Sequence, residues 1–113
     1  MEVLSLVEKA LNIRAYYHKV LAGNVANVET PNYKEKDIDF NRALDSNMRK
    51  SEDIEVKEKT SHDDFNSTDG NTVNMEDQVV KMTENNLYFN SLTKIVTRKF
   101  ATMRYIITVG KGG

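Results

Sequence analysis

Residues 74–109 of this chain read NMEDQVVKMTENNLYFNSLTKIVTRKFATMRYIITV, and this stretch decides the fold. Apolar side chains recur along it at alternating spacings of four and three, which is the pattern of a coiled-coil seam on a helix. The spacing predicts a helix of about 36 residues, roughly 54 Å long, that ends before Gly110. Eight of the ten seam positions are apolar, and the ten are Met75, Val79, Met82, Asn86, Phe89, Thr93, Val96, Phe100, Met103 and Ile107.

A second apolar stripe at helical period runs along residues 2–28, so this segment is also predicted to be helical. Two helices of this length can pair as an antiparallel or crossing hairpin. One hairpin hides only a single strip of each helix, whereas both apolar stripes are wide. Because uncovered apolar surface usually marks a place where more protein packs, we expect this chain to complete its core by assembling with other helices.

The segment between the two helices differs from them in character. Residues 46–72 hold seven acidic and four basic residues with few apolar ones, a composition typical of a mobile or weakly ordered insertion. Helical spacing over residues 39–49 predicts one short helix. The alternation of Ile54 and Val56 is compatible with one short strand.

The predicted fold class is therefore mainly α. Two long amphipathic helices at the N- and C-termini pack as a helical hairpin or coiled coil, with a short helix and a polar, partly disordered or weakly β middle segment between them. At 113 residues the chain is long enough for one domain. We expect that domain to span residues 1–113, with an N-terminal helix at 1–28, a connector and mobile insertion at 29–73, and a C-terminal helix at 74–109.

Composition excludes several classes of function. The chain has no cysteine, which removes disulfide frameworks, thiol nucleophiles and cysteine zinc sites. Its 16 basic and 17 acidic residues give a net charge of −1, which argues against a nucleic-acid partner. No apolar run reaches the roughly 18–20 residues that span a bilayer, and no cleavable signal peptide is visible. Without a catalytic set, a metal-ligand cluster or a phosphate loop, neither an enzyme nor a cofactor or metal site is expected.

The most specific pattern lies in the connector, which reads Asn24-Val25-Ala26-Asn27-Val28-Glu29-Thr30-Pro31-Asn32-Tyr33. Two asparagines three residues apart can tie the end of a helix to neighbouring backbone, because each amide both donates and accepts hydrogen bonds. Thr30-Pro31 stops the helix, since the residue before proline disfavours helical geometry. Pro31-Asn32 suits a type II turn, in which asparagine tolerates the positive φ angle, and Tyr33 can anchor the emerging chain.

These residues resemble the N-terminal signature of the bacterial flagellar axial proteins, the family of rod, hook and hook-associated subunits. The chain departs from that signature at Asn32, where the family usually has glycine. Its short length, together with the segments 36–40 and 70–75 and the Asn85-Asn86 pair, is similar to the short proximal rod subunits of this family. The matching signature residues are Asn24, Val25, Ala26, Asn27, Thr30, Pro31 and Tyr33.

The resemblance implies a structural building block rather than an enzyme, with no cofactor. Such subunits are exported by the flagellar type III apparatus without a cleaved signal peptide. In the flagellar basal body they polymerise through their terminal helices into the rod, the drive shaft that transmits torque. The implied partners are other rod subunits, the rod adaptor, the flagellar export gate and further copies of the chain, with no nucleic acid and no membrane span.

We expect residues 3–28 and 75–107 to form the inner packing layer of such an assembly. The sequence leaves one alternative open, a small cytoplasmic helical adaptor or export chaperone that holds a partner's amphipathic helix in a methionine-rich groove. Location separates the two, because a rod subunit lies outside the cytoplasmic membrane. The candidate assembly residues are Asn24, Asn27, Thr30, Pro31, Tyr33, Met82, Asn86, Phe89, Val96, Phe100 and Met103.

Overall fold

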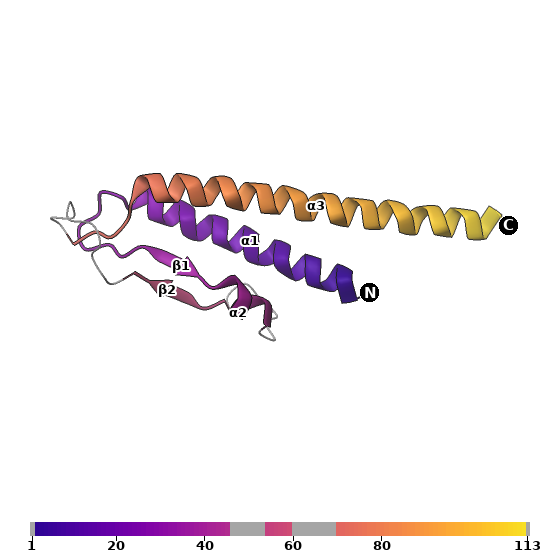
Figure 1. Ribbon diagram of the computed structural model, residues 1–113, viewed down its shortest axis with the longest axis horizontal. Coiled ribbons are helices and arrows are strands. Elements are labelled where there is room, and N and C mark those ends of the chain that lie inside the picture. Colours follow the sequence, from indigo (N-terminus) through magenta and orange to yellow (C-terminus); the bar gives the residue numbers. More distant parts are fainter. Residues whose placement is uncertain (1, 46–53, 60–69, 113) are drawn as a thin grey trace.

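The computed structural model describes residues 2–45, 54–59 and 70–112. Helices α1 and α3 lie side by side and antiparallel, so that both chain termini are at the same end of an elongated molecule of 71 × 26 × 18 Å (Figure 1). The expected mainly α fold, with two long terminal helices packed on each other, is confirmed. In chain order the elements are α1 (Glu2–Ala26), β1 (Lys36–Ile38), α2 (Phe40–Asp45), β2 (Val56–Glu58) and α3 (Met75–Gly112).

The described part of the middle segment forms a third layer, which we call the middle layer and which consists of β1, α2 and β2. The two strands pair antiparallel, with Lys36 opposite Glu58 and Ile38 opposite Val56. Helix α1 lies between this layer and α3 (Figure 1). The sequence predicted the short helix and the strand near Val56, but it did not predict β1. Residues 46–53 and 60–69, most of the expected mobile insertion, lie outside the described residues.

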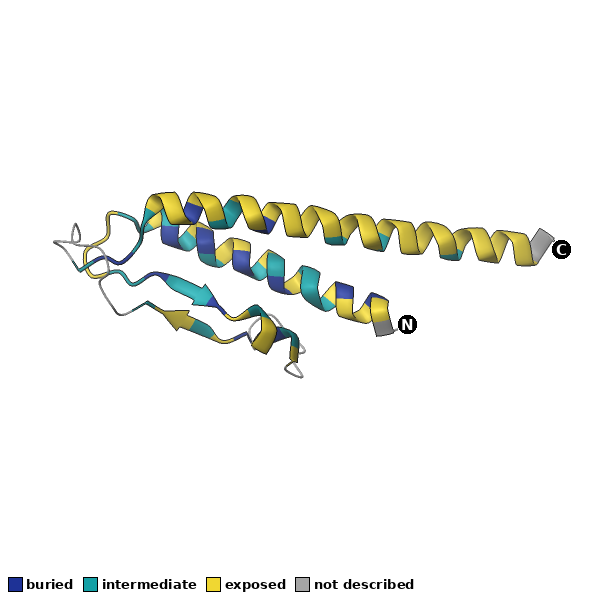
Figure 2. Cartoon of the chain, in the orientation of Figure 1, coloured by how far each residue is buried: buried dark blue, intermediate teal, exposed yellow. Residues whose placement is uncertain are grey.

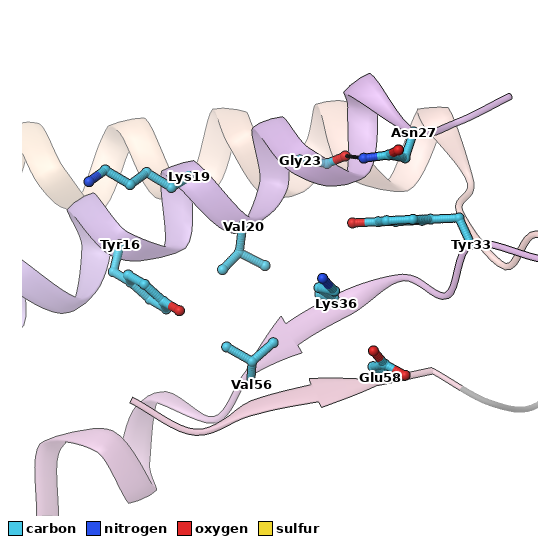
Figure 3. A pocket seen from close by; sticks show the side chains of 9 residues that line it. All are labelled: Tyr16, Lys19, Val20, Gly23, Asn27, Tyr33, Lys36, Val56 and Glu58. Carbon is cyan, nitrogen blue, oxygen red and sulfur yellow. Dashed lines mark hydrogen bonds between the residues drawn. The ribbon is translucent and has the colours of Figure 1, made fainter. Parts of the chain in front are cut away.

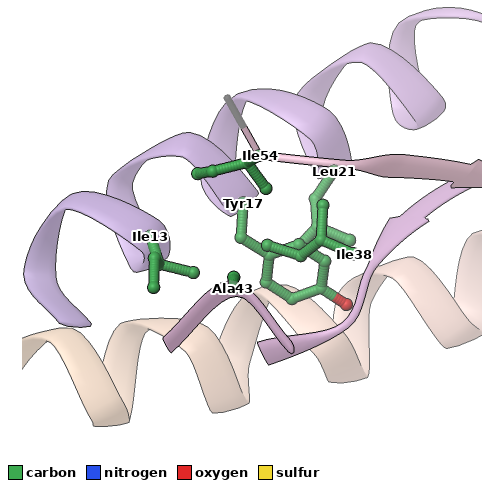
Figure 4. Packing of buried hydrophobic residues seen from close by; sticks show 6 residues of the cluster. All are labelled: Ile13, Tyr17, Leu21, Ile38, Ala43 and Ile54. Atoms are coloured by element: carbon green, nitrogen blue, oxygen red, sulfur yellow. The ribbon is translucent and has the colours of Figure 1, made fainter. Parts of the chain in front are cut away.

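The buried core lies between α1 and the middle layer. Ile13, Tyr17 and Leu21 follow each other at spacings of four on one face of α1, so they point the same way. The Tyr17 ring packs edge-on against Phe40 of α2, with ring centroids 4.9 Å apart. The rest of this cluster is Ile38 of β1, Ala43 of α2 and Ile54, two residues before β2 (Figure 4).

The side of α3 that faces α1 differs by one residue from the predicted seam. Gln78 and Asn85 are buried there, whereas Val79 and Asn86, which the spacing placed in the seam, are exposed. The cause is chemical, because both buried amides hydrogen-bond groups of α1. Most of α3 is exposed, while α1 carries regularly spaced buried positions (Figure 2). Of the other predicted positions, Met82, Val96 and Met103 are half-buried, and Met75, Phe89, Thr93, Phe100 and Ile107 are exposed.

Both helix ends differ slightly from the predicted bounds. Helix α1 ends at Ala26 rather than at residue 28, where Asn27 begins a tight turn. Helix α3 runs through Gly110 to Gly112, so the predicted stop at Gly110 is wrong. Glycine ends a helix only where the chain turns into the left-handed region, and otherwise accepts helical geometry. Within the described residues, none of the helices combines the length and the apolar character that crossing a membrane requires.

The core position Ile13 offers a test of this packing. Its side chain has no exposed surface, so Ile13→Ala leaves a cavity and is expected to lower the free energy of unfolding by about 2–5 kcal/mol. Leu87→Ala is the control, because Leu87 is 64% exposed and its loss is expected to cost less than about 0.5 kcal/mol. Urea unfolding followed by circular dichroism measures both, and equal losses in the two variants would contradict this core.

Candidate assembly interface

A fully buried amide lies where α1, β1 and α3 meet. Asn24, in the last turn of α1, has no exposed surface. Its Nδ2 donates to the carbonyl oxygen of Lys36 (2.8 Å) and to Oε1 of Gln78 (3.0 Å). Its Oδ1 accepts from the N–H of Lys36 (3.0 Å) and from the hydroxyl of Tyr33 (3.3 Å). Each donor and acceptor of the amide is therefore used. We call Asn24 with these three partners the Asn24 junction.

A buried carboxylate extends the Asn24 junction into α3. Glu35 is only 4% exposed, and Nε2 of Gln78 donates to its Oε1. Nζ of Lys81, one turn further along α3, lies 3.4 Å from the other Glu35 oxygen and 3.5 Å from Asp37 Oδ2. Partners of this kind are required, because a carboxylate withdrawn from water without them is costly. The first two turns of α3 are thus held to β1 by charge and by hydrogen bonds.

The residues just before α3 bind the connector that follows α1. Nδ2 of Asn71 donates to three carbonyl oxygens, those of Asn27 (2.9 Å), Val28 (3.1 Å) and Thr30 (2.7 Å). Carbonyls at and beyond a helix end lack a partner within the helix, and the Asn71 side chain supplies one here. Thr72 continues the link, because its Oγ1 accepts from the N–H of Glu35 (2.7 Å).

The turn predicted at Pro31-Asn32 is present. The N–H of Tyr33 donates to the carbonyl of Thr30 (3.3 Å), and Asn32 has a φ angle of +63°. Gly70 packs against this turn with a φ angle of +77°, and a Cβ atom there would lie 2.5 Å from Oδ1 of Asn32. Both the backbone angle and the space therefore favour glycine at position 70.

Arg14 joins the three layers further along α1. Its guanidinium stacks on the ring of Phe40 in α2 (3.6 Å to the ring centroid) and on that of Tyr88 in α3 (4.2 Å). Nδ2 of Asn85 donates to the backbone carbonyl of Arg14 (3.0 Å). Burial lowers the pKa of Arg14 from its usual value, and burial and then the Asp37 carboxylate raise the pKa of the neighbouring Tyr17 phenol.

Grooves open between the layers in the described part of the chain, and two of them bear on assembly. One, of about 570 Å³, separates α1 from the middle layer and is lined by Tyr16, Lys19, Val20, Gly23, Asn27, Tyr33, Lys36, Val56 and Glu58 (Figure 3). The other, of about 290 Å³, lies between α1 and α3 and has mostly apolar walls, formed by Ala15, His18, Lys19, Asn85, Asn86 and Phe89. Among the described residues, no cluster of three or more His, Asp or Glu side chains is placed to hold a metal ion.

Large apolar side chains remain uncovered on both terminal helices. On α3, Leu87 is 64%, Ile106 is 62% and Tyr105 is 70% exposed, and near the start of α1, Val3 is 60% exposed. Helix α3 has 38 residues and α1 has 25, so α3 runs past the N-terminal end of α1, and no other described element packs on it there (Figure 1). One chain therefore leaves uncovered the kind of surface that the sequence predicted.

The candidate assembly residues of the connector lie close together, whereas the candidate assembly residues of α3 are spread along that helix. Asn27 Nδ2 donates to the carbonyl of Gly23 (2.8 Å), and its Oδ1 accepts from the Thr30 hydroxyl (3.0 Å). Asn24 and Tyr33 belong to the Asn24 junction, and Pro31 lies exposed in the turn. Of the α3 candidates, Met82, Val96 and Met103 are half-buried, while Asn86, Phe89 and Phe100 are exposed.

Several residues that hold the site together were not among the candidate assembly residues. One signal was available, because Gln78 and Asn85 are seven residues apart, as two equivalent positions of a heptad repeat are. A search for apolar seam positions passes over polar ones. No local pattern marks Glu35 or Arg14, whose partners lie far away in the chain. The residues missed are Arg14, Glu35, Asn71, Thr72, Gln78 and Asn85.

No known protein-family profile matches the chain. It is similar, over nearly its whole length, to curated proteins named flagellar basal body rod protein FlgB. The Bacillus subtilis protein is 28% identical over 121 residues, covering 93% of this chain and 92% of its own. The Escherichia coli K12 protein is 28% identical over 129 residues (95% and 94%), and that of Aquifex aeolicus is 29% identical over 117 residues (92% and 91%).

The Asn24 junction is tested by comparing two asparagines. Asn24→Ala leaves the backbone of Lys36 and the side chain of Gln78 without their partner, at about 1–3 kcal/mol for each buried group. The free energy of unfolding is expected to fall by at least about 2 kcal/mol. Asn86→Ala, at an exposed position of α3, is expected to change it by less than about 0.5 kcal/mol. Urea unfolding measures both, and a mild effect of Asn24→Ala would argue against the junction.

Proposed function

Because this chain belongs to the FlgB-like family of flagellar basal-body rod proteins, we propose that it is a structural subunit of the proximal rod. It polymerises there through its terminal helices and helps to form the shaft that transmits torque. The observation that carries this proposal is the uncovered apolar surface of α3, which a single chain leaves in water. The whole span of residues 1–113 acts as one rod-subunit domain.

The architecture suits a part that bears load. The Asn24 junction, the Glu35 contacts and the stacked Arg14 fix α1, α3 and the middle layer to one another through polar groups of defined geometry. Directional bonds of this kind set one arrangement of the helices, which apolar contacts alone leave less defined. The subunit then passes force between neighbours through its helices instead of deforming. Contacts that repeat without closing produce a filament or tube.

The partners proposed for this surface are other rod subunits, further copies of the chain, the rod adaptor and the flagellar export gate. The chain reaches its place in the basal body by export across the cytoplasmic membrane without a cleaved signal peptide. The assembly surface includes Asn24, Asn27, Thr30, Pro31 and Tyr33 at the connector. On α3 it includes Met82, Asn86, Phe89, Val96, Phe100 and Met103.

The cytoplasmic adaptor or chaperone is the weaker alternative. It requires a methionine-rich groove for a partner helix. The groove between α1 and α3 is walled by Ala15, Phe89 and polar residues, and its described lining includes no methionine. Similarity over more than nine-tenths of the length of rod proteins also favours the structural role.

The direct test is to delete the gene and image purified basal bodies. We expect basal bodies that lack the rod, with motility restored by the gene supplied in trans. Tagged chain is expected in intact basal bodies, outside the cytoplasmic membrane. Complete rods in the deletion strain, or chain found only in the cytoplasm of a flagellated cell, would overturn the proposal.

A variant of the connector separates assembly from export. Asn27→Ala removes two local hydrogen bonds that shape the turn after α1, so rod assembly is expected to suffer more than export of the chain. The measurements are swimming on soft agar and the amount of chain outside the cytoplasmic membrane. Asn90→Ala, an exposed asparagine of α3, is the matched control. Normal swimming of the Asn27→Ala strain would count against this role of the connector.

A further inference from the structure

Helix α3 carries a second seam that α1 does not cover. Met75, Val79, Phe89, Phe100 and Ile107 follow the coiled-coil spacing, and each is between 37% and 55% exposed. We call these five residues the free stripe. At 100° per residue, the free stripe lies roughly 60° around α3 from the side that Gln78 and Asn85 turn toward α1. Helix α3 therefore has two seams, each able to contact a helix. Within a single chain, α1 covers one of them.

The free stripe continues into a groove. Phe89 belongs to it and also lines the mostly apolar groove of about 290 Å³ between α1 and α3. On the far wall of that groove stand Ala15, His18 and Lys19 of α1. A third helix laid along the free stripe would thus rest against both α1 and α3, beside a seam that is already packed. Its apolar side chains would fill the groove as knobs fill holes in a coiled coil.

The distribution of charge along the chain indicates which helix would pack on the free stripe. Residues 85–113 contain five basic residues and no acidic one, which leaves a net charge of −6 on residues 1–84. The first turn of α3 presents Glu76 and Asp77, both exposed, at the end of the helix where Met75 begins the free stripe. The other end presents the exposed Lys99 and Arg104 beside Phe100 and Ile107. We call the first end the acidic base and the second the basic tip of α3.

We propose that the basic tip of α3 in one copy docks along the free stripe at the acidic base of α3 in a second copy, so that copies add head to tail. This rests on the proposed function, because a rod requires contacts that repeat without closing. Two tips that meet are repelled by their like charges, whereas tip and base attract. The tip extends past α1, so a neighbour can reach its apolar residues without displacing the subunit's own helix (Figure 1).

Paired charge reversals test the proposal in purified full-length chain. The tip variant carries Lys99→Glu with Arg104→Glu, and the base variant carries Glu76→Lys with Asp77→Lys. Each variant alone places like charges at the contact, so its self-association is expected to weaken about tenfold or more. Sedimentation velocity over a range of concentrations measures it, and circular dichroism confirms that the helices are intact. Glu8→Lys, an exposed reversal on α1, is the control and is expected to associate as the unaltered chain does.

Mixing gives the sharpest outcome. In an equimolar mixture, each altered tip can meet an altered base of opposite charge and each unaltered tip an unaltered base, so growth into chains longer than dimers is expected to return. A mixture that fails to associate, or one that stops at a closed dimer, overturns head-to-tail docking. The apolar part is tested by Ile107→Ala, expected to weaken association, against Val80→Ala, an exposed residue outside the free stripe that is expected to leave it unchanged.

A second arm of the experiment uses vesicles of anionic phospholipid. If the basic tip serves to bind a membrane surface, the unaltered chain would bind these vesicles and the tip variant would not. Self-association of the tip variant would then equal that of the unaltered chain, and this result overturns the proposal. The outcomes also separate the two proposals. Charge reversals without effect in a chain that still enters rods overturn the docking alone. Head-to-tail growth by a chain that never enters rods overturns the proposed function alone.

Discussion

One buried amide sets the arrangement of the whole molecule. Asn24 has no contact with water, and its donors and acceptors are met by groups from β1, the connector and α3. An amide buried in this way tolerates little displacement, because each lost bond leaves a buried polar group without a partner. The end of α1, the start of β1 and the first turn of α3 are consequently fixed together at one point. The rest of the fold extends from there.

This constraint also decides which face of α3 stays free. Both Gln78 and Asn85 place amides toward α1, and their bonds hold α3 in one rotation about its axis. Apolar spacing alone does not choose between two rotations one residue apart, since Met82 and Val96 belong to both seams. The polar contacts choose the rotation that leaves Val79, Phe89 and Phe100 uncovered. A polar position within a helical seam commonly fixes register in this manner, at some cost in stability.

What the sequence predicts well here is local. Thr30, Pro31 and Asn32 determine the end of α1 and the turn after it by their own backbone preferences, and the positive φ angle of Asn32 follows from its side chain. The long helices follow from apolar spacing in the same direct way. The resemblance to the flagellar axial proteins can be recognised for the same reason, because the signature that carries it lies in this local segment.

What the sequence does not predict depends on distant partners. Ile54 lies in a segment whose composition is typical of a mobile insertion, yet it completes the core with Ile38 and Ala43 because α1 offers them a continuous apolar face. Apolar spacing places the side of α3 that faces α1 one residue away from its observed position, because this spacing carries no information about amide partners. Gly110 lies within α3 and does not end it, since glycine permits a helix stop without requiring one.

Polar and apolar contacts have different roles in this chain. Inside the chain, buried polar groups define geometry, and such groups add little net stability because their desolvation offsets most of what their bonds contribute. The apolar core that remains is small, and much of the apolar surface of α3 faces outward. A chain built in this way gains much of its stability only when a neighbour covers that surface, because binding to the folded state alone shifts folding by mass action. Such coupling suits a subunit that becomes rigid where it is assembled.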